Sequence, residues 1–464
     1  MSTVFIYPTI RPALDSQYHP AVLANRAFRA AAKATGKPVK VGIALERSPE
    51  SVSRFEAELL PEDHPKAPQN FLFSERLLKF LLWSRGGHKI YFAGPRELWL
   101  RLERYYRESP AGKFDAEIMG EKIYERPFEI VHVSHDQLPP ANEVSAPLGR
   151  HLEGYRIGFD LGASDRKTAA VINGKAVFSE EVPWDPRSQS DPRWHFDQIM
   201  DSLKRAAAHL PRVEAIGGSS AGVYVNNQVK VASLFRGVPE EAFKRGVKDL
   251  FLDLKRAWNN IPFEVVNDGE VTALAGAMAL KANGVLGIAL GSSQAAGYVT
   301  RDGNITSWLN ELAFAPLDYH PAAPVDEWSG DYGCGVQYFS QQAVGRLLPE
   351  SGLEIDRTVP LPEKLVEVQQ RMRKGDERAG KIYQTIGVYL GYSMAHYAEF
   401  YDFEHLLVLG RVTSGSGGEI IVGTARKVLA NEFPELRIQL HLPDEKEKRH
   451  GQAIAAASLP VIVK

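Results

Sequence analysis

Two stretches of the chain, RIGFDLGAS at residues 156–164 and GVLGIALGSS at residues 284–293, share one pattern. Each is an apolar run of strand length that ends in glycine and small hydroxyl residues. VEAIGGSSAG (213–222) and FEVVND (263–268) read as further strands, and an Ala-rich helical run follows Asp268. Strands that alternate with helices indicate an α/β architecture. The repeated opening predicts that the α/β unit is duplicated.

The chain before residue 150 also reads as mixed α/β. We expect strands at VKVGIAL (39–45) and HKIYFAG (88–94). We expect helices at SPESVSRFEAELL (48–60), SERLLKFLLWS (74–84) and PRELWLRLERYY (95–106). The run QLPPANEVSAPLG (137–149) carries three prolines and little periodicity, so it is the expected linker. The expected domains are an N-terminal α/β extension of unknown role at 1–150, a first lobe at 151–281, and a second lobe with a closing helix at 282–464.

Composition restricts the class of protein. The 464 residues include 55 Lys and Arg and 57 Asp and Glu, so the net charge of −2 gives no general attraction to nucleic acid or anionic membranes. Cys334 is the one cysteine, which excludes an intramolecular disulfide framework and suits a reducing compartment. The N-terminus lacks the features of a signal peptide, and no apolar run reaches the length of a membrane span. We expect a cytoplasmic protein.

Three turns are candidates for phosphate or nucleotide binding, although Walker-type and dinucleotide-binding glycine motifs are absent. Free backbone N–H groups in such turns can bind an anion, and an aspartate at a strand end can hold the Mg²⁺ of a nucleotide through water. Taken singly, each turn is better explained as an ordinary turn, but three of them in register with a repeated lobe favour the binding interpretation. The candidate residues are Asp160, Gly162 and Ser164 in the first turn, Gly291, Ser292 and Ser293 in the second, and Gly410 and Gly415 in GRVTSGSGG.

From about residue 155 to 460, the order of motifs resembles the ROK group of sugar kinases and repressors, within the actin, hexokinase and chaperone-ATPase superfamily. The matching stretches are DLGAS for its first phosphate turn, VVND before its sugar site, LGSSQAAG for its second phosphate turn, NELAF for its G-E-x-G-H motif, LGRVTSGSGG for its adenosine turn and GQAIAAASLP for its closing helix. This resemblance implies a glucokinase-like core of two RNase H-like, actin-like ATPase lobes with a central cleft, preceded by the extension.

The resemblance also implies chemistry. Asp268 would be the general base that takes the proton of a sugar hydroxyl as it attacks the γ-phosphate of ATP, with Mg²⁺ bound near Asp160. Asn267 and Glu311 would bind sugar hydroxyls. From the residues alone, Asp268 is as well explained as a cap of the following helix, with Glu270 near the positive helix end.

Several positions depart from the group's pattern. Phe314 stands in place of its histidine, and YGCGVQYFSQ (332–341) keeps only Cys334 and Gly335 of its zinc knuckle, with Gln341 in place of a sugar-binding glutamate. One thiolate cannot build a site that needs four ligands, so we expect no zinc. His320 is a substitute sugar contact or a structural residue.

The phosphate turns also depart, with side chains at Ala163, Ser293 and Ala295 where the group has glycine. Asp165 would repel a triphosphate unless Arg166 or Lys167 offsets its charge.

The expected function is an ATP-dependent sugar kinase whose partner is a small-molecule sugar. The alternative is a non-catalytic sugar- or nucleotide-binding sensor on the same scaffold. A DNA-binding regulator is disfavoured, because residues 1–150 net only +3 (21 Lys and Arg minus 18 Asp and Glu) and contain a strand where a helix-turn-helix needs its second helix. We expect no nucleic-acid or membrane partner, and homodimer formation stays open.

Overall fold

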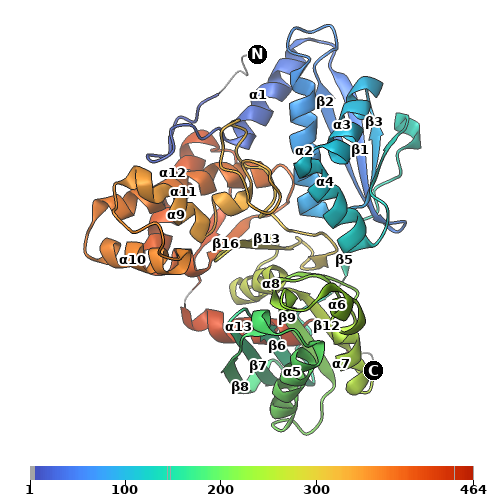
Figure 1. Cartoon of the computed structure of the whole chain (residues 1–464), viewed down its shortest axis with the longest axis vertical. Helices are drawn as coiled ribbons and strands as arrows, with labels where there is room; N and C mark the ends of the chain where they lie inside the picture. The colour runs from blue at the N-terminus through green and yellow to red at the C-terminus, as the bar shows by residue number, and fades with distance from the viewer. Residues whose placement is uncertain (1–5, 144, 147, 444, 463–464) are drawn as a thin grey trace.

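The computed structural model describes residues 6–143, 145–146, 148–443 and 445–462. Within these residues the strands form sheets of four, five and six strands and a two-stranded ribbon. Figure 1 shows the N-terminal unit in blue, the sheet nearest the C-terminal label in green, and the remaining sheet between them with its orange helices. The α/β class is confirmed. No helix in the described part of the chain is both long and apolar enough to cross a bilayer.

The N-terminal unit has a four-stranded sheet in the order β2-β1-β3-β4. Its elements are α1 (Ala21–Ala34), β1 (Val39–Ser48), β2 (Ser51–Leu59), α2 (Gln69–Arg85), β3 (Lys89–Ala93), α3 (Arg96–Glu108), α4 (Pro110–Glu117), a π-helical turn η1 (Ile118–Tyr124) and β4 (Glu129–His132). Helix α2 stops because Gly86 takes φ +79° while its N–H binds the carbonyl of Leu82. The strands expected at 39–45 and 88–94 and the helices expected at 74–84 and 95–106 are confirmed.

The helix expected at 48–60 is wrong, because residues 51–59 form strand β2. Only Pro49 and Glu50 separate β1 from β2, and the two strands pair antiparallel from Ser48 opposite Ser51 to Val39 opposite Leu59. A two-residue connection joins antiparallel strands as a β-hairpin. Pairing with β1 therefore decides the conformation of residues 51–59, although their apolar residues are spaced as in a helix.

The five-stranded sheet has the order β12-β9-β6-β7-β8. Its strands β12, β9 and β6 are parallel, and β7 and β8 continue from β6 as an antiparallel meander. The elements of this unit are β6 (Tyr155–Leu161), β7 (Asp165–Ile172), β8 (Lys175–Pro183), α5 (Pro192–Ala207), β9 (Ala215–Ser220), the ribbon β10 (Val223–Val225) and β11 (Gln228–Val231), α6 (Glu240–Gly246), α7 (Leu250–Ala257), β12 (Phe263–Asn267) and α8 (Asp268–Leu280).

The six-stranded sheet repeats this plan in the order β17-β16-β13-β14-β15-β5. Strand β13 takes the place of β6, with an antiparallel hairpin on one side and parallel strands on the other, as the duplicated motifs indicated. Its elements are β5 (Ser145–Ala146), β13 (Val285–Leu290), β14 (Gln294–Val299), β15 (Ile305–Thr306), α9 (Gln341–Ser351), α10 (Leu361–Arg373), α11 (Glu377–Tyr397), β16 (His405–Leu409), α12 (Ser416–Glu432), β17 (Gln439–His441) and α13 (Glu445–Ala457). The expected linker 137–149 therefore supplies the edge strand β5, which pairs with β15.

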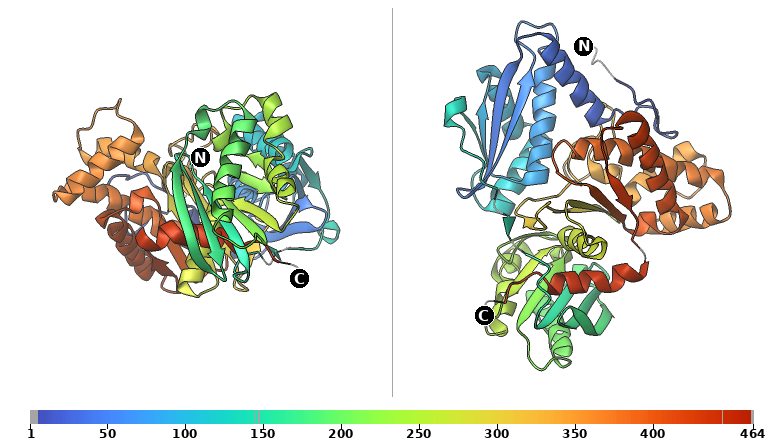
Figure 2. Two further views of the ribbon diagram at one scale, coloured as in Figure 1. Left: turned by 90° about the horizontal axis from the view of Figure 1, so that it is seen from below. Right: turned by 180° about the vertical axis from the view of Figure 1, so that it is seen from behind.

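Helices α8 and α13 pass each other between the two larger sheets (Figure 2). Helix α13 packs on β6 and β9, where a Cβ on Gly158 or Gly217 would lie 1.8 or 1.7 Å from a carbonyl oxygen of α13. The glycines thus admit the helix backbone directly onto the sheet. We expected α13 to belong to the second lobe, residues 282–464, but it packs on the five-stranded sheet of the first lobe.

The N-terminal unit is not the independent extension that we expected. One apolar core runs from its sheet and helix α2 into the helices α9, α11 and α12 of the six-stranded unit. Helix α1 packs on α11, and its first residue, Ala21, donates its N–H to the carbonyl of Leu317 at 2.9 Å. Because the core is continuous, the described part of this unit packs as one body with the six-stranded unit.

Candidate active site

Three parallel strands of the five-stranded sheet carry polar residues at their carboxyl ends. Asp160 on β6 lies opposite Ser219 on β9, and Asn267 at the end of β12 lies opposite Ser220. Ser219 Oγ donates to Asp160 Oδ1 at 2.7 Å. The carboxyl ends of parallel strands are where open α/β sheets bind ligands, so this edge is the candidate site.

The cap of helix α8 is Asn267. Its Oδ1 accepts the N–H of Gly269 at 2.7 Å, and its Nδ2 donates to the carbonyl of Gly222 at 2.7 Å. Asp268 is the first helical residue, and its Oδ1 accepts the neighbouring Gly269 N–H at 3.0 Å. The N-cap position is therefore held by Asn267 rather than by Asp268, although Asp268 does accept an N–H of the first turn.

Asp268 and Glu311 interact electrostatically with each other, and Asp268 also with Asp160. Burial, and secondarily the charge of Asp160, raises the pKa of Asp268 from 3.8 to about 6. Burial, and secondarily Asp268, raises the pKa of Glu311 from 4.5 to about 7. Carboxyl groups with pKa values close to neutrality are suited to accept and return protons.

Glu311 lies in a loop held by the N-terminal unit. Its backbone N–H donates to the carbonyl of Trp83 at 2.9 Å, and that of Asn310 donates to the carbonyl of Ser84 at 3.0 Å. Both acceptors are at the C-terminal end of α2, where helix carbonyls lack intrahelical partners. This contact joins residues more than two hundred positions apart, and nothing in the local sequence indicates it.

Sequence reasoning placed Glu270 only near the helix end, but the structure buries its carboxyl group. Asn310 Nδ2 donates to Oε1, and the N–H of Tyr298 donates to Oε2 at 3.3 Å. Burial raises the pKa of Glu270 to about 8. Tyr401 fixes the amide of Asn310 by donating its hydroxyl to Oδ1 at 2.9 Å. Glu270 therefore anchors the strand β14 and the Asn310 loop to the start of α8.

The first glycine turn is closed by its own backbone. The N–H of Gly162 donates to the carbonyl of Asp165 at 2.9 Å, and Ser164 Oγ donates to the Asp165 carboxylate at 3.0 Å. Lys167 Nζ lies 3.2 Å from Asp165 Oδ1 and 3.7 Å from Asp160 Oδ2. Lys167 therefore offsets the acidic residue in the turn.

The second turn is similarly closed, with the N–H of Gly291 bound to the carbonyl of Ser293 at 2.9 Å. Ser292 and Ser293 are exposed, and the carbonyl of Gly291 accepts the N–H of Gln341 at 2.9 Å. This turn follows β13, which occupies in its sheet the place that β6 occupies in the other.

The third turn lies against the second. Gly410 has φ +104°, and a Cβ there would lie 2.4 Å from the carbonyl oxygen of Leu290. Gly415, with φ +70°, precedes α12. Two cavities border this turn. One of about 360 Å³ lies between α10, Gln341 and the turn, and one of about 630 Å³ lies between the turn, α8 and β17.

The described contacts of His320 and Phe314 are with residues outside the carboxylate cluster of Asp160, Asp268 and Glu311. His320 accepts the N–H of Ala322 at its Nδ1, 3.1 Å away, and interacts electrostatically with His19 before α1. The ring of Phe314 lies 4.3 Å from that of Trp83 on α2. Neither set of described contacts reaches Asp268.

The surroundings of Cys334 do not fit a zinc ion. The thiol is buried beside backbone carbonyls, and burial raises its pKa to about 12. In the part of the chain that the structure describes, no group of three or more His, Cys, Asp or Glu side chains is arranged to hold a metal. The absence of zinc remains a prediction.

No family model matches the chain, and no curated protein matches it. Solved structures do. The ROK hexokinase from Thermus thermophilus is 17% identical, with 65% of this chain and 98% of that chain covered and a TM-score of 0.52. A ROK glucokinase from Streptomyces griseus, crystallised with glucose and AMPPNP, is 20% identical, with coverage of 66% and 98% and a TM-score of 0.50.

A ROK family transcriptional regulator, a homologue of the E. coli MLC protein, is also similar. It is 17% identical, with 66% of this chain and 79% of that chain covered and a TM-score of 0.53. The matched fold thus serves sugar kinases and a regulator of transcription. About a third of this chain lies outside each match. The resemblance that the motif order indicated is confirmed at the level of the fold: over roughly two thirds of its length, this chain has the fold of the ROK proteins.

Proposed function

We propose that the protein is an ATP-dependent sugar kinase of the ROK type, with the two larger sheets as lobes on either side of a catalytic cleft. The observation that carries the proposal is the cluster of Asp160 and Asp268 at the strand ends with Glu311 of a neighbouring loop, since Asp268 interacts electrostatically with both of the other carboxyl groups. A carboxylate base beside a phosphate site is the arrangement that phosphoryl transfer to an alcohol needs.

Asp268 has the properties of the general base. A pKa of about 6 leaves it ionised at neutral pH while keeping it basic enough to accept a hydroxyl proton in the transition state. Its carboxylate accepts backbone N–H groups at the start of α8, among them that of Gly269, and in this proposal its remaining acceptor positions take the sugar hydroxyl. In the proposed reaction the sugar oxygen attacks the γ-phosphorus, its proton moves to Asp268, and ADP leaves.

Glu311 and Asn267 orient the sugar in this proposal. Within the described part of the chain the Glu311 carboxylate has no hydrogen-bond partner, so in this proposal its oxygens accept hydroxyl hydrogen bonds from the sugar. Asn267 has one amide N–H committed to Gly222, which leaves the second for a sugar oxygen. His320 contributes less directly, since its described contacts lie on the side of His19.

The residues fit a magnesium nucleotide. Asp160 offers a carboxylate whose Oδ2 lies 3.7 Å from Lys167 Nζ, and hard carboxylate oxygens suit Mg²⁺. Bound there through water, Mg²⁺ would neutralise charge on the phosphates. The phosphates would lie against the turns at Gly162 with Ser164 and at Gly291 with Ser292 and Ser293.

The base of ATP fits the smaller cavity beside the third turn. Its lining includes Gln341, whose N–H binds Gly291 of the phosphate turn, and the turn residues Arg411 and Ser414. Val366 of α10 is 49% exposed beside it and offers an apolar surface for a flat ring. Gly410 and Gly415, at the two ends of the turn, add no side chains there.

The second candidate function is a sensor that binds a sugar or nucleotide without catalysis. It is favoured by the closed glycine turns, because the N–H groups of Gly162 and Gly291 are already bound within the protein. A turn that must open before it binds phosphate binds it more weakly. The similarity to a ROK regulator is compatible with this reading.

A coupled ADP-release assay over hexoses, amino sugars and polyols separates the two. The kinase proposal expects sugar-dependent ADP formation with at least one member of the panel. Saturable sugar binding without ADP formation across the panel supports the sensor and overturns the kinase.

A further inference from the structure

The segment from Trp308 to Cys334 lacks helices and extended strands, yet it carries Glu311. Its own backbone hydrogen bonds close turns and short bridges, such as the bond from the Leu317 N–H to the Gly333 carbonyl at 2.8 Å, and contacts with neighbouring elements add to its order. Helix α2 of the N-terminal unit supplies acceptors for two of its N–H groups, at Trp83 and Ser84. These two bonds are made by Glu311 and by its neighbour Asn310.

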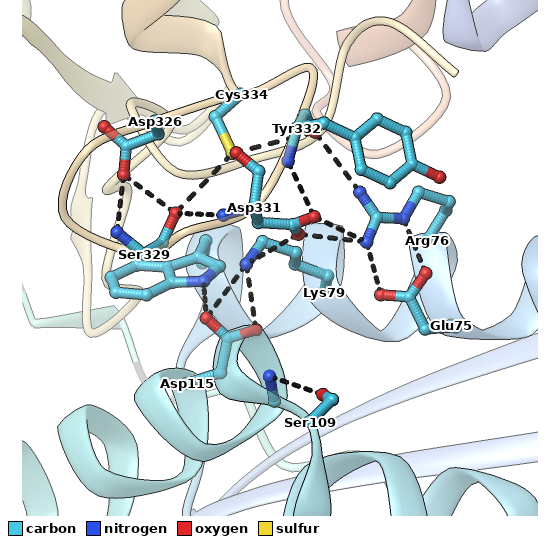
Figure 3. A network of polar contacts seen from close by, with 12 residues as sticks. Glu75, Arg76, Lys79, Ser109, Asp115, Asp326, Ser329, Asp331, Tyr332 and Cys334 are labelled. Carbon is cyan, nitrogen blue, oxygen red and sulfur yellow. Dashed lines mark hydrogen bonds and ion pairs between the residues drawn. The ribbon is translucent and has the colours of Figure 1, made fainter. Parts of the chain in front are cut away.

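A buried ionic network attaches the far end of the segment to the same helix (Figure 3). Lys79 Nζ lies 3.0 Å from Asp115 Oδ1 on α4 and 3.0 Å from Asp331 Oδ2 on the segment. Arg76 Nη2 lies 2.9 Å from Asp331 Oδ2, and the Arg76 side chain is also paired with Glu75. Burial raises the pKa of Asp331, but the two cations outweigh it and hold that pKa below its usual value.

Aromatic contacts complete the attachment between these two ends. The ring of Phe314 packs on Trp83 at 4.3 Å and on Phe114 at 5.8 Å. Trp83 is itself fixed, because its Nε1 donates to Asp115 at 2.9 Å. The same aspartate therefore positions both Lys79 and Trp83, and one cluster fixes the segment near Glu311, at Phe314 and at Asp331.

The N-terminal unit also contacts the ribbon of β10 and β11. Glu125, just after η1, pairs with Lys248 at 2.6 Å and with Lys230 of β11 at 3.2 Å. The ribbon of β10 and β11 directly follows Gly222, which holds the amide of Asn267. The unit thus contacts both the Glu311 loop and the ribbon that follows Gly222, the partner of Asn267.

We propose that the N-terminal unit completes the sugar site, with Lys79 and Trp83 as positioning residues that act through Asp331 and the Glu311 backbone. This rests on the proposed function. Ordering Glu311 in advance reduces the entropy lost when a sugar binds, so loss of the network weakens sugar binding and leaves nucleotide binding, on the other side of the cleft, unchanged.

The test uses the full chain with Lys79→Met and Asp331→Asn. Lys79→Met removes the central cation, and Asp331→Asn keeps the shape of the segment residue, so it provides the measurement if the first variant does not fold. Leu102→Ala is the matched control, because Leu102 is a fully buried core residue of the same unit on α3. It lowers the stability of the unit without removing any member of the network.

Hydrogen–deuterium exchange and calorimetry give the readouts. Residues 308–334 should exchange faster in both network variants and at the unmodified rate in Leu102→Ala. The sugar dissociation constant should rise about tenfold or more, while that of ATP stays within twofold. Unchanged exchange in both network variants, or an equal loss of sugar affinity in Leu102→Ala, overturns the proposal. If the unmodified protein binds no sugar, the proposed function fails, and exchange alone decides whether α2 orders the segment.

Discussion

Replacing Asp268 by asparagine should lower the rate of catalysis and raise the stability of the folded protein. Burial raises the pKa of Asp268 from 3.8 to about 6, so its ionised form is disfavoured in the folded protein. A shift of about two units corresponds to roughly 3 kcal/mol, and partial solvent contact reduces this to about 1–3 kcal/mol. Asparagine removes that penalty.

The pH dependence follows from the same shift. A carboxyl group whose pKa is raised on folding favours the folded state below its unfolded pKa, and that stability is lost as pH rises to the folded pKa. The variant should therefore be more stable than the unmodified protein at pH 7.5. The difference should shrink toward zero as the pH is lowered from about 6 to about 4.

Turnover should fall by about 10²–10⁴-fold in Asp268→Asn, because an amide cannot accept the hydroxyl proton. Asn267→Ala is the paired variant: it removes the cap of α8 and should lower stability by about 0.5–2 kcal/mol. Chemical unfolding at pH 7.5 and at about pH 4 measures the stability, and steady-state kinetics measure the turnover. A loss of stability in Asp268→Asn at pH 7.5, or retention of most of its turnover, would refute the reasoning.

Three further outcomes are expected. The kcat/KM for sugar should fall on the acid side with an apparent pKa of about 6, as Asp268 becomes protonated, and a flat profile between pH 5 and 7 would count against it. Gly410→Ala should weaken ATP binding, because its Cβ meets the Leu290 carbonyl at φ +104°, whereas Gly423→Ala, in open space on α12, should leave ATP affinity unchanged; titration calorimetry measures both. Elemental analysis after chelation should find no stoichiometric zinc, since Cys334 lies among carbonyls and a lysine network, and retained zinc would show otherwise.

The sequence predicted the strands and helices whose conformation follows from the local spacing of apolar residues and from the glycines that end them. The runs ending at Gly162 and Gly291 are strands followed by turns, and their repetition agrees with the shared strand order of the two sheets. The helix expected at 48–60 failed because its conformation depends on pairing with β1 rather than on its own spacing. The asparagine cap was missed because Asn267 and Asp268 both suit that position, and only the backbone at the strand end decides between them.

The parts of the site that depend on distant contacts could not be predicted. Asn310 and Glu270 are both polar in the sequence, and nothing local shows that they bind each other in a buried position. The role of Trp83 requires knowing that α2 ends next to the Glu311 loop, a contact between units that the sequence had suggested were separate. Long-range packing of this kind has no periodic signal.

The central claim is that this chain moves the γ-phosphate of ATP to a sugar hydroxyl with Asp268 as base. Incubation with γ-labelled ATP, Mg²⁺ and the sugar panel, followed by isolation of the sugar fraction, tests it most directly. The account predicts label in a sugar phosphate with the unmodified protein and at least a hundredfold less with Asp268→Asn. Sugar that is bound but stays unlabelled, or label transfer that survives Asp268→Asn unchanged, would contradict the account.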